Sequence, residues 1–214
     1  QASSGTTKDI LLTYFMVKII KMNRLKNHTA YLAGAIDKVT ASDAMEWRED
    51  MTDFLNDLGI GVFNPCDKPI YNTTVHEDND FVSMVEALKD RGNYDEVQKI
   101  MQEIVRIDLN FVDLCNFMIL NIEPDCHMCG SYGEQTVACL QRKPIIIHCS
   151  KGISKIPNWL FGVCDPKMFF ESWIDVKGYI KDICYDVSVD DNDKKWRFID
   201  YHKAFGKRIR AYSQ

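Results

Sequence analysis

The residues best suited to chemistry in this sequence are two carboxylates, Asp108 and Glu134. Asp108 interrupts an apolar stripe that recurs at three- and four-residue steps along a predicted helix over 97–115. A carboxylate on the buried face of a helix costs several kcal/mol unless it is paired or binds a ligand. Asp108 therefore either belongs to a site or is satisfied by a neighbour, such as Arg48 or Arg106.

Glu134 follows a short apolar run at 117–122 that is typical of a buried parallel strand. Ligands of such sheets bind beyond the ends of the strands. Gly130 and Gly133 would let a ligand approach the start of the next helix, which we expect at Ser131. Ser131 and Glu134 also have the spacing of a capping box, in which both side chains would serve only the helix start. If a ligand binds there, Glu134 and Asp108 would point into the same crevice.

The elements around these residues alternate between strands and helices, which predicts an α/β fold with a parallel sheet and helices on both faces. A capping box at Thr40–Asp43 is expected to open the first helix of the sheet domain, and Gly59 to end it. The expected strands are 29–34, 60–63, 117–122 and 144–148, and the expected helices are 40–58, 81–90, 97–115, 131–142, 169–183 and 196–212.

The chain has 214 residues, of which 46% are hydrophobic, enough to bury one core. We expect an N-terminal extension over 1–28, an α/β catalytic domain over 29–186 and a C-terminal helical extension over 187–214. The polar, turn-rich start of segment 66–96 marks this segment as a loop and helix inserted into the domain.

Composition excludes several classes of protein. A net charge of -5 argues against binding to duplex nucleic acid, which relies on phosphate contacts. The apolar run over 10–20 is interrupted by polar residues and is shorter than the roughly 20 residues that span a bilayer, so no membrane association is expected. The eight cysteines lack the spacing of a secreted scaffold and no secretory leader opens the chain, which together predict reduced thiols in a cytoplasmic protein.

Two other groups of residues could carry chemistry. Cys126 and Cys129 have the C-x-x-C spacing of half a zinc site, but no second such pair completes it, so no metal is expected. The segment 148–155 resembles the loop of cysteine-dependent phosphatases, with Cys149 as the nucleophile, but Lys155 stands where the phosphate-binding arginine is needed. No phosphate-binding loop of the Walker type and no G-x-G-x-x-G motif is present, and no cofactor is expected.

Taken in order, several short motifs together resemble the nucleoside 2-deoxyribosyltransferase family, which includes related N-glycosidases acting on nucleoside 5′-monophosphates. The resemblance covers roughly 29–158. Its motifs are Tyr31-Leu32-Ala33-Gly34, Trp47-Arg48 followed by Gly59 to Pro65, Asp108-Leu109 with Asp113, and Gly130-Ser131-x-x-Glu134 ahead of Lys143-Pro144.

This resemblance implies a flavodoxin-like or Rossmann-like sheet of about five strands and a homo-oligomer. It also implies that Glu134 is the nucleophile, that Asp108 handles the base and that Tyr31 orients Glu134. The substrates would be a nucleoside or nucleotide and a free nucleobase. The substrate-binding residues expected on this basis are Gly34, Arg48, Asp113, Gly130, Ser131, Gly133 and Asn158.

Breaking an N-glycosidic bond passes through an oxocarbenium-like state, which a carboxylate can stabilise and then trap covalently. A second base would then give 2-deoxyribosyl transfer, while water would give hydrolysis of a 5′-monophosphate; a catalytically silent nucleotide-binding or signalling module is a third reading. One position departs from the family, because Met128 stands where its transferases carry an aspartate. Either Asp113 or Asp125 takes the role of this aspartate, or the substrate is not a plain nucleoside, or activity is reduced.

Overall fold

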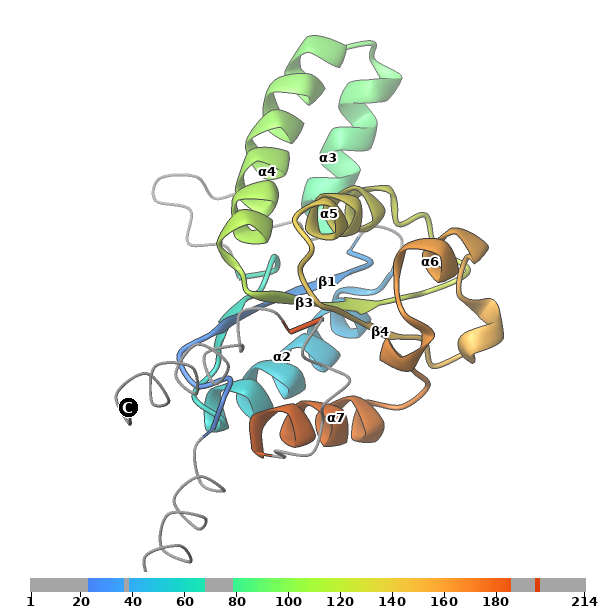
Figure 1. The fold of residues 1–214 in the computed structure, drawn as a ribbon. Coiled ribbons are helices and arrows are strands. Elements are labelled where there is room, and N and C mark those ends of the chain that lie inside the picture. The colour runs from blue at the N-terminus through green and yellow to red at the C-terminus, as the bar shows by residue number, and fades with distance from the viewer. Residues whose placement is uncertain (1–22, 37–38, 68–78, 186–194, 197–214) are drawn as a thin grey trace, which may run out of the picture.

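Five parallel strands form a single sheet at the centre of the molecule (Figure 1). The computed structural model describes residues 23–36, 39–67, 79–185 and 195–196. Within them the strand order is β2-β1-β3-β4-β5, which is the flavodoxin-like order and confirms the predicted fold class. The strands are β1 (Thr29–Gly34), β2 (Gly61–Phe63), β3 (Phe117–Asn121), β4 (Ile145–His148) and β5 (Phe169–Phe170).

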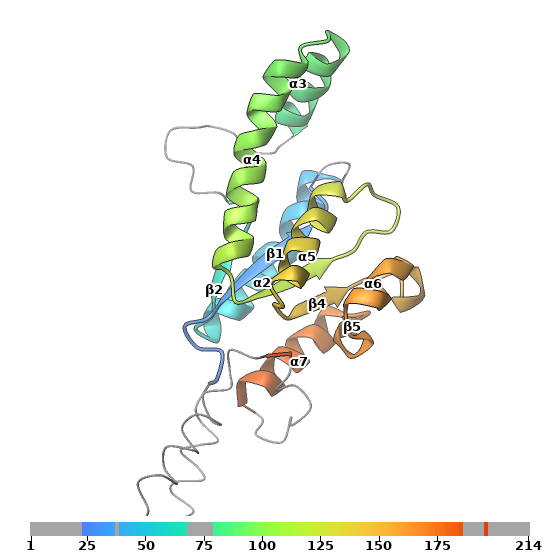
Figure 2. The ribbon, with the colours of Figure 1, turned by 45° about the horizontal axis from the view of Figure 1, so that its top comes forward.

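Helices cover both faces of this sheet, as the alternation of elements predicts. Figures 1 and 2 show α2 and α7 on one face and α4, α5 and α6 on the other. The helical hairpin of α3 and α4 projects beyond the sheet as an arm. The helices are α2 (Ala41–Asp57), α3 (Asn79–Asp90), α4 (Tyr94–Leu114), α5 (Cys129–Leu140), α6 (Asn158–Val163) and α7 (Trp173–Tyr185), with short 3-10 turns at Ile153–Lys155 and Pro166–Met168.

Alternation along the strands divides the core into two layers. On β1, Tyr31 and Ala33 pack in the cluster on the α4–α5 face, whereas Ala30 and Leu32 pack in the cluster on the α2–α7 face. Every residue of β3 and β4 is buried, as expected for central strands covered on both sides. The side-chain period of two therefore decides which strand residues can face a given site, and Tyr31 is directed toward α4 and α5.

The predicted helix signals at the start of the sheet domain are confirmed. Thr40 is the N-cap of α2, and its side-chain oxygen accepts a hydrogen bond of 3.0 Å from the backbone N–H of Asp43. Gly59 follows the end of α2 with φ +68°, a conformation that favours glycine. The Thr40 cap and Gly59 therefore set where α2, the helix between β1 and β2, begins and ends.

The expected helix over 169–183 is wrong at its start. Phe169 and Phe170 form β5, the edge strand beside β4, and α7 begins only at Trp173. Ser172 explains the boundary, because its Oγ accepts a hydrogen bond of 3.1 Å from the backbone N–H of Asp175 and so caps the helix start. The residues after β4, expected as a loop, also include the 3-10 turn at 153–155 and the short helix α6.

Some expectations concern parts of the chain outside the described residues. Residues 197–212 of the predicted C-terminal helix, most of the N-terminal extension and residues 68–78 of the insertion belong to this group. Within the insertion, α3 is present where a short helix is expected. Across the part of the chain that the structure describes, no helix is both long enough and apolar enough to pass through a bilayer.

Candidate active site

A cavity of about 620 Å³ lies on the α4–α5 side of the sheet, beyond the end of β1. Its walls come from β1 and the residues after it, from α4, and from α5 with the loop that precedes it. Tyr31, Asp108 and Glu134 all line this space, which we call the Glu134 cavity. The cavity lies next to the β1–β3 boundary, where the strand order reverses and where ligands of open α/β sheets bind.

Tyr31 is the buried group around which the two carboxylates converge. Its side chain is fully buried in β1, and its hydroxyl makes no hydrogen bond of regular geometry. Burial raises the pKa of Tyr31 well above that of an ordinary tyrosine, and the negative charges of Glu134 and Asp108 add to this rise. The phenol therefore stays protonated, close to both carboxylates, and can donate a proton to a hydrogen bond with Glu134.

Asp108 reaches the cavity from α4 at the position where the apolar stripe is interrupted. Its side chain is 8% exposed, and the neighbouring members of the stripe, Ile104 and Phe111, are buried. Met101 and Ile104 line the same wall of the cavity. Arg106, one of the neighbours considered for pairing, is exposed on α4. The structure thus places this carboxylate in an apolar wall that faces a ligand-sized space.

Glu134 lies in the second turn of α5, because this helix begins at Cys129, two residues earlier than expected. Met128 is the N-cap residue, and its side chain makes no capping hydrogen bond. The Ser131 hydroxyl instead donates a hydrogen bond of 3.0 Å to the Gly34 carbonyl oxygen. The capping-box interpretation of Ser131 and Glu134 is therefore wrong, and the half-buried Glu134 side chain faces the cavity.

The glycines around the cavity differ in the space beside their Cα atoms. A Cβ added at Gly130 or Gly133 would meet no atom within 4 Å, so both positions open onto free space along the first turns of α5. A Cβ at Gly34 would lie 2.9 Å from Cζ2 of Trp47. Gly34 lines the cavity, but its lack of a side chain is required by the packing of α2 against the end of β1.

Three of the expected substrate-binding residues do not line the Glu134 cavity. Arg48 is completely buried and donates hydrogen bonds to the carbonyl oxygens of Leu32 (3.3 Å) and Gly34 (3.0 Å). Asp113 is exposed near the far end of α4, where its carboxylate accepts a hydrogen bond from Gln141. Asn158 is exposed at the start of α6.

Met128 stands where the resemblance in sequence predicts an aspartate. Met128 is buried, lines the cavity, and its sulfur accepts a hydrogen bond of 3.3 Å from the backbone N–H of Glu123. Asp125 is exposed and forms an ion pair of 2.6 Å with Lys151, whose hydrogen bond lowers the pKa of Asp125. Neither Asp113 nor Asp125 lines the cavity, so neither takes the place of the missing aspartate.

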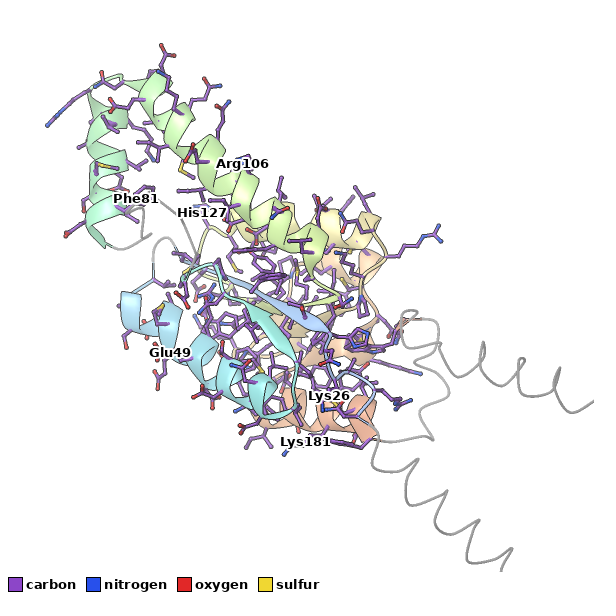
Figure 3. The ribbon with its side chains drawn as sticks, turned by 90° about the vertical axis from the view of Figure 1, so that its left-hand side faces the viewer. Lys26, Glu49, Phe81, Arg106, His127 and Lys181 are labelled. Atoms are coloured by element: carbon purple, nitrogen blue, oxygen red, sulfur yellow. The ribbon has the colours of Figure 1, made fainter. Side chains whose placement is uncertain are left out.

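Sequence reasoning did not identify the apolar wall or the rim of this cavity. Met101, Ile104 and Val105 belong to the helical stripe and are expected to be core residues, but Val105 is 49% exposed. His127, in the loop before α5, also lines the cavity and lies near the base of the arm in Figure 3. The only signal for these residues in the sequence is their proximity to Asp108 and Glu134.

A second cavity, of about 670 Å³, lies on the opposite, α2–α7 side of the same sheet edge. Trp173 stacks on Trp47 with ring centroids 5.1 Å apart and on His148 at 3.8 Å. His148 is buried, and its Nδ1 lies 2.8 Å from Oδ1 of Asn121. Burial lowers the pKa of His148 to about 4, so this ring is neutral at pH 7. We call this space the His148 cavity; its acidic rim consists of Asp43, Glu46, Asp50, Glu123 and Glu171.

The two alternative chemistries find no support in the geometry. Cys149 is buried, and this burial raises the pKa of its thiol, the opposite of what a nucleophilic cysteine needs. Cys126 is half-buried and Cys129 is exposed. Among the described residues, no three or more His, Cys, Asp or Glu side chains are grouped so that they could hold a metal ion.

Comparisons with known proteins find similarity only at the level of structure. No protein-family model and no curated protein sequence matches the chain. It is similar to the solved structure of a 2-deoxyribosyltransferase from Bacillus psychrosaccharolyticus, with 18% identity, a TM-score of 0.47, and coverage of 71% of this chain and 91% of that one. It is also similar to the CMP N-glycosidase BcmB of Clostridium botulinum, with 13% identity, a TM-score of 0.44, and coverage of 72% and 97%.

Proposed function

We propose that this chain is an enzyme that cleaves the N-glycosidic bond of a deoxynucleoside or deoxynucleotide and transfers the sugar to another base. The observation that supports this proposal is the convergence of Tyr31, Asp108 and Glu134, from three different elements, on one cavity. The volume of about 620 Å³ lies within the range of roughly 300–1,000 Å³ typical of small-molecule sites.

In this proposal Glu134 attacks the anomeric carbon of the sugar. Positive charge develops on the sugar as the bond to the base breaks, and the carboxylate stabilises this charge before it forms a covalent glutamyl-deoxyribose ester. The buried Tyr31 hydroxyl, which remains protonated, orients the Glu134 carboxylate. The attack displaces the base and leaves the sugar attached to α5.

Asp108 is the proposed acid for the departing base. It lies in the wall opposite α5, and an apolar setting favours the protonated form of a carboxyl group. Asp108 gives its proton to a ring nitrogen of the base as the bond breaks. When a second base attacks the glutamyl-deoxyribose, Asp108 takes a proton back, Glu134 is released and a new nucleoside forms.

The remaining walls suit the flat, largely apolar surface of a nucleobase. Met101, Ile104, Met128 and Val137 line the cavity around the two carboxylates. Apolar walls with a few converging polar groups are typical of small-molecule sites. Because Met128 stands where an aspartate is expected, its side chain can contact the substrate only through apolar packing.

Hydrolysis of a deoxynucleoside 5′-monophosphate is the second candidate, supported by the first turn of α5. The first N–H groups of a helix have no partner within the helix, and they favour anions. Gly130 and Gly133 leave open space beside this turn, and both line the cavity. A 5′-phosphate bound there would place the sugar beside Glu134.

The products of two incubations distinguish these functions. We would incubate the full chain with each deoxynucleoside plus a different free base, and separately with each deoxynucleoside monophosphate, and separate the products by chromatography. A new nucleoside identifies a transferase, and free base alone identifies a glycosidase. Binding without product identifies a silent nucleotide-binding module and refutes the proposal of an enzyme.

Mass spectrometry tests the covalent step directly. Brief incubation with substrate followed by acid quenching should add one deoxyribosyl group to the peptide that contains Glu134. Glu134→Gln should show no added group, whereas Glu171→Gln, on the rim of the His148 cavity, should behave as the parent protein. Turnover that persists in Glu134→Gln would refute the nucleophile.

The resemblance in sequence also implies a homo-oligomer, which we propose for this chain. Light scattering coupled to size-exclusion chromatography measures the mass in solution. A mass equal to the 24.8 kDa of one chain at micromolar concentration would refute it.

A further inference from the structure

Two cysteines that the proposed reaction does not use lie close together, one on α5 and one at the end of α6. Cys139 lies near the end of α5, and Cys164 is the C-cap residue of α6. The buried amide of Gln135 lies between them, with its Nε2 2.9 Å from Sγ of Cys139 and 3.8 Å from Sγ of Cys164. Figures 1 and 2 show α5 and α6 on the same side of the sheet.

The two thiols are unequal acids. The hydrogen bond that Cys164 donates to Cys139 lowers the pKa of Cys139 to about 7, despite partial burial, and the Gln135 amide acts in the same direction. The same interaction, together with burial, raises the pKa of Cys164. By contrast, burial raises the pKa of Cys115 to about 11 and that of Cys184 to about 11. Near neutral pH, therefore, Cys139 loses its proton more readily than Cys164, and it is the more nucleophilic thiol of the pair.

A small cavity gives solvent access to this pair. Its volume is about 220 Å³, and its walls include both cysteines together with Arg142 and Lys195. Lys195 forms an ion pair of 2.5 Å with Asp165, beside Cys164. Both cysteines are half-buried rather than enclosed. A small oxidant can thus reach the sulfur atoms.

We propose that Cys139 and Cys164 form a reversible redox pair that closes to an intramolecular disulfide when a hydroperoxide is present. The Cys139 thiolate attacks the peroxide oxygen, which breaks the O–O bond and gives a sulfenic acid and water or an alcohol. Cys164 then loses its proton and attacks the Cys139 sulfur, which forms the S–S bond and releases a second water. The two thiols are oxidised together and the hydroperoxide is reduced.

The bond would tie α5 covalently to the end of α6. α5 carries Ser131 and Glu134 in its first two turns, and Gln135 supports both sulfurs from the same helix. Formation of the disulfide would change the contacts that the Gln135 amide makes with the two sulfur atoms, on the turn of α5 that follows Glu134. The inference needs no part of the proposed glycosidic reaction and stands if that reaction is refuted.

The first test uses the fully reduced full chain and hydrogen peroxide. After treatment, blocking of remaining thiols and digestion, mass spectrometry should find the Cys139 and Cys164 peptides joined, with the loss of two hydrogen atoms, and a thiol reductant should separate them. Cys129, which is exposed, and Cys115, which is buried, are the internal controls and should remain free thiols. Oxidation of Cys129 before Cys139, or two free thiols at 139 and 164, would overturn the proposal.

A second test separates the two steps. In Cys164→Ala the sulfenic acid on Cys139 has no partner, so a sulfenic-acid reagent such as dimedone should label Cys139 in this variant and label it much less in the parent protein. Alkylation of Cys139 with iodoacetamide should be half-maximal near pH 7 in the parent and shift to the ordinary thiol range near pH 8.5 in Cys164→Ala. An unchanged profile, or equal labelling in both proteins, would contradict the pairing.

Discussion

The two cavities lie at the same end of the strands, on opposite faces of the sheet. They differ in where their polar side chains lie and in what these side chains bond to. The Glu134 cavity has apolar walls with the hydroxyl of Tyr31 and the carboxylates of Asp108 and Glu134 inside them. The His148 cavity has an acidic rim over stacked aromatic rings. Ala35 belongs to the lining of both, so the residues just after β1 separate them.

The polar groups of the His148 cavity bond largely within the protein. His148 pairs with Asn121 at 2.8 Å, and Asp50 forms an ion pair of 2.7 Å with Lys177. Glu171 accepts a hydrogen bond of 2.9 Å from the backbone N–H of Ile153. In the Glu134 cavity, the buried Tyr31 hydroxyl has no regular hydrogen bond. A buried hydroxyl of this kind is costly unless a neighbouring side chain or a ligand satisfies it, and Glu134 is the side chain within reach.

Replacing one carboxylate of each cavity by its amide should give the largest difference in kcat. Glu134→Gln should lower kcat by about 10⁴-fold, because an amide cannot form the covalent ester and cannot stabilise the positive sugar. Glu171→Gln keeps an oxygen that can accept from Ile153, so it should change kcat by less than about 2-fold. Steady-state kinetics of both variants measures the contrast. Equal losses would show that the His148 cavity takes part in the reaction.

Arg48 should matter for stability rather than for binding. Replacement by Met removes charged hydrogen bonds to the carbonyl oxygens of Leu32 and Gly34 inside the core, so the free energy of unfolding should fall by about 3–4 kcal/mol. Arg106→Met is the exposed control and should change it by no more than about 0.5 kcal/mol. Urea unfolding measures both. An Arg48→Met variant of unchanged stability but raised KM would restore the substrate-binding role.

His148 should make stability depend on pH. Its folded pKa of about 4 lies below the ordinary value of 6.5, so between these values the unfolded chain binds more protons than the folded one. The contribution is complete above pH 6.5 and is lost as pH falls toward 4, by up to about 3 kcal/mol. Urea unfolding at several pH values, compared with His148→Gln, isolates this contribution. The two proteins should differ in slope over this window, and parallel curves would contradict a neutral buried histidine.

Tyr31→Phe tests whether the buried hydroxyl belongs to catalysis. The variant should lower kcat by about 10–100-fold, because Glu134 loses the donor that orients it. Its free energy of unfolding should fall by no more than about 1 kcal/mol, since the change removes a contact with Glu134 but also removes a buried polar group. Kinetics and urea unfolding on the same preparation test both parts. A loss of stability with full activity would mean that the hydroxyl is structural.

Ser131→Ala is expected to have the smallest effect. It removes the hydrogen bond of 3.0 Å from the serine hydroxyl to the Gly34 carbonyl oxygen and should cost about 1 kcal/mol of unfolding free energy. Thr136→Ala is a matched control on the same helix, because its hydroxyl donates only to the Tyr132 carbonyl one turn earlier. A rise in KM for Ser131→Ala with unchanged stability would show that the hydroxyl serves the substrate.

The sequence predicted the features that depend on regular periodicity. The buried runs at β1, β3 and β4 and the Thr40 cap are confirmed, since each has a local pattern with one physical meaning. Asp108 breaks such a pattern, which predicts a special role for it, and it does line the cavity.

Features that depend on tertiary packing were not predictable in this way. β5 has only two residues, too few for an alternation, and it is a strand only because β4 lies beside it. Ser131 has the spacing of a cap but bonds to β1, since α5 begins earlier. Arg48 was expected at the site from the resemblance, and Asp113 follows Asp108 on α4, yet one is directed under the end of β1 and the other away from the site. Spacing along a chain does not specify these directions.

One oxygen atom connects the two sides of the sheet. The Gly34 carbonyl accepts hydrogen bonds of 3.0 Å from Ser131 on α5 and of 3.0 Å from Arg48 on α2. A carbonyl oxygen has two lone pairs, and both are engaged here. Both helices are therefore hydrogen-bonded to the same oxygen atom, so a shift of this carbonyl that follows the loss of one bond should alter the other. Changes made under one layer are then transmitted to the helix that carries Glu134, and Ser131→Ala combined with Arg48→Met should cost a different amount from the sum of the two changes made separately.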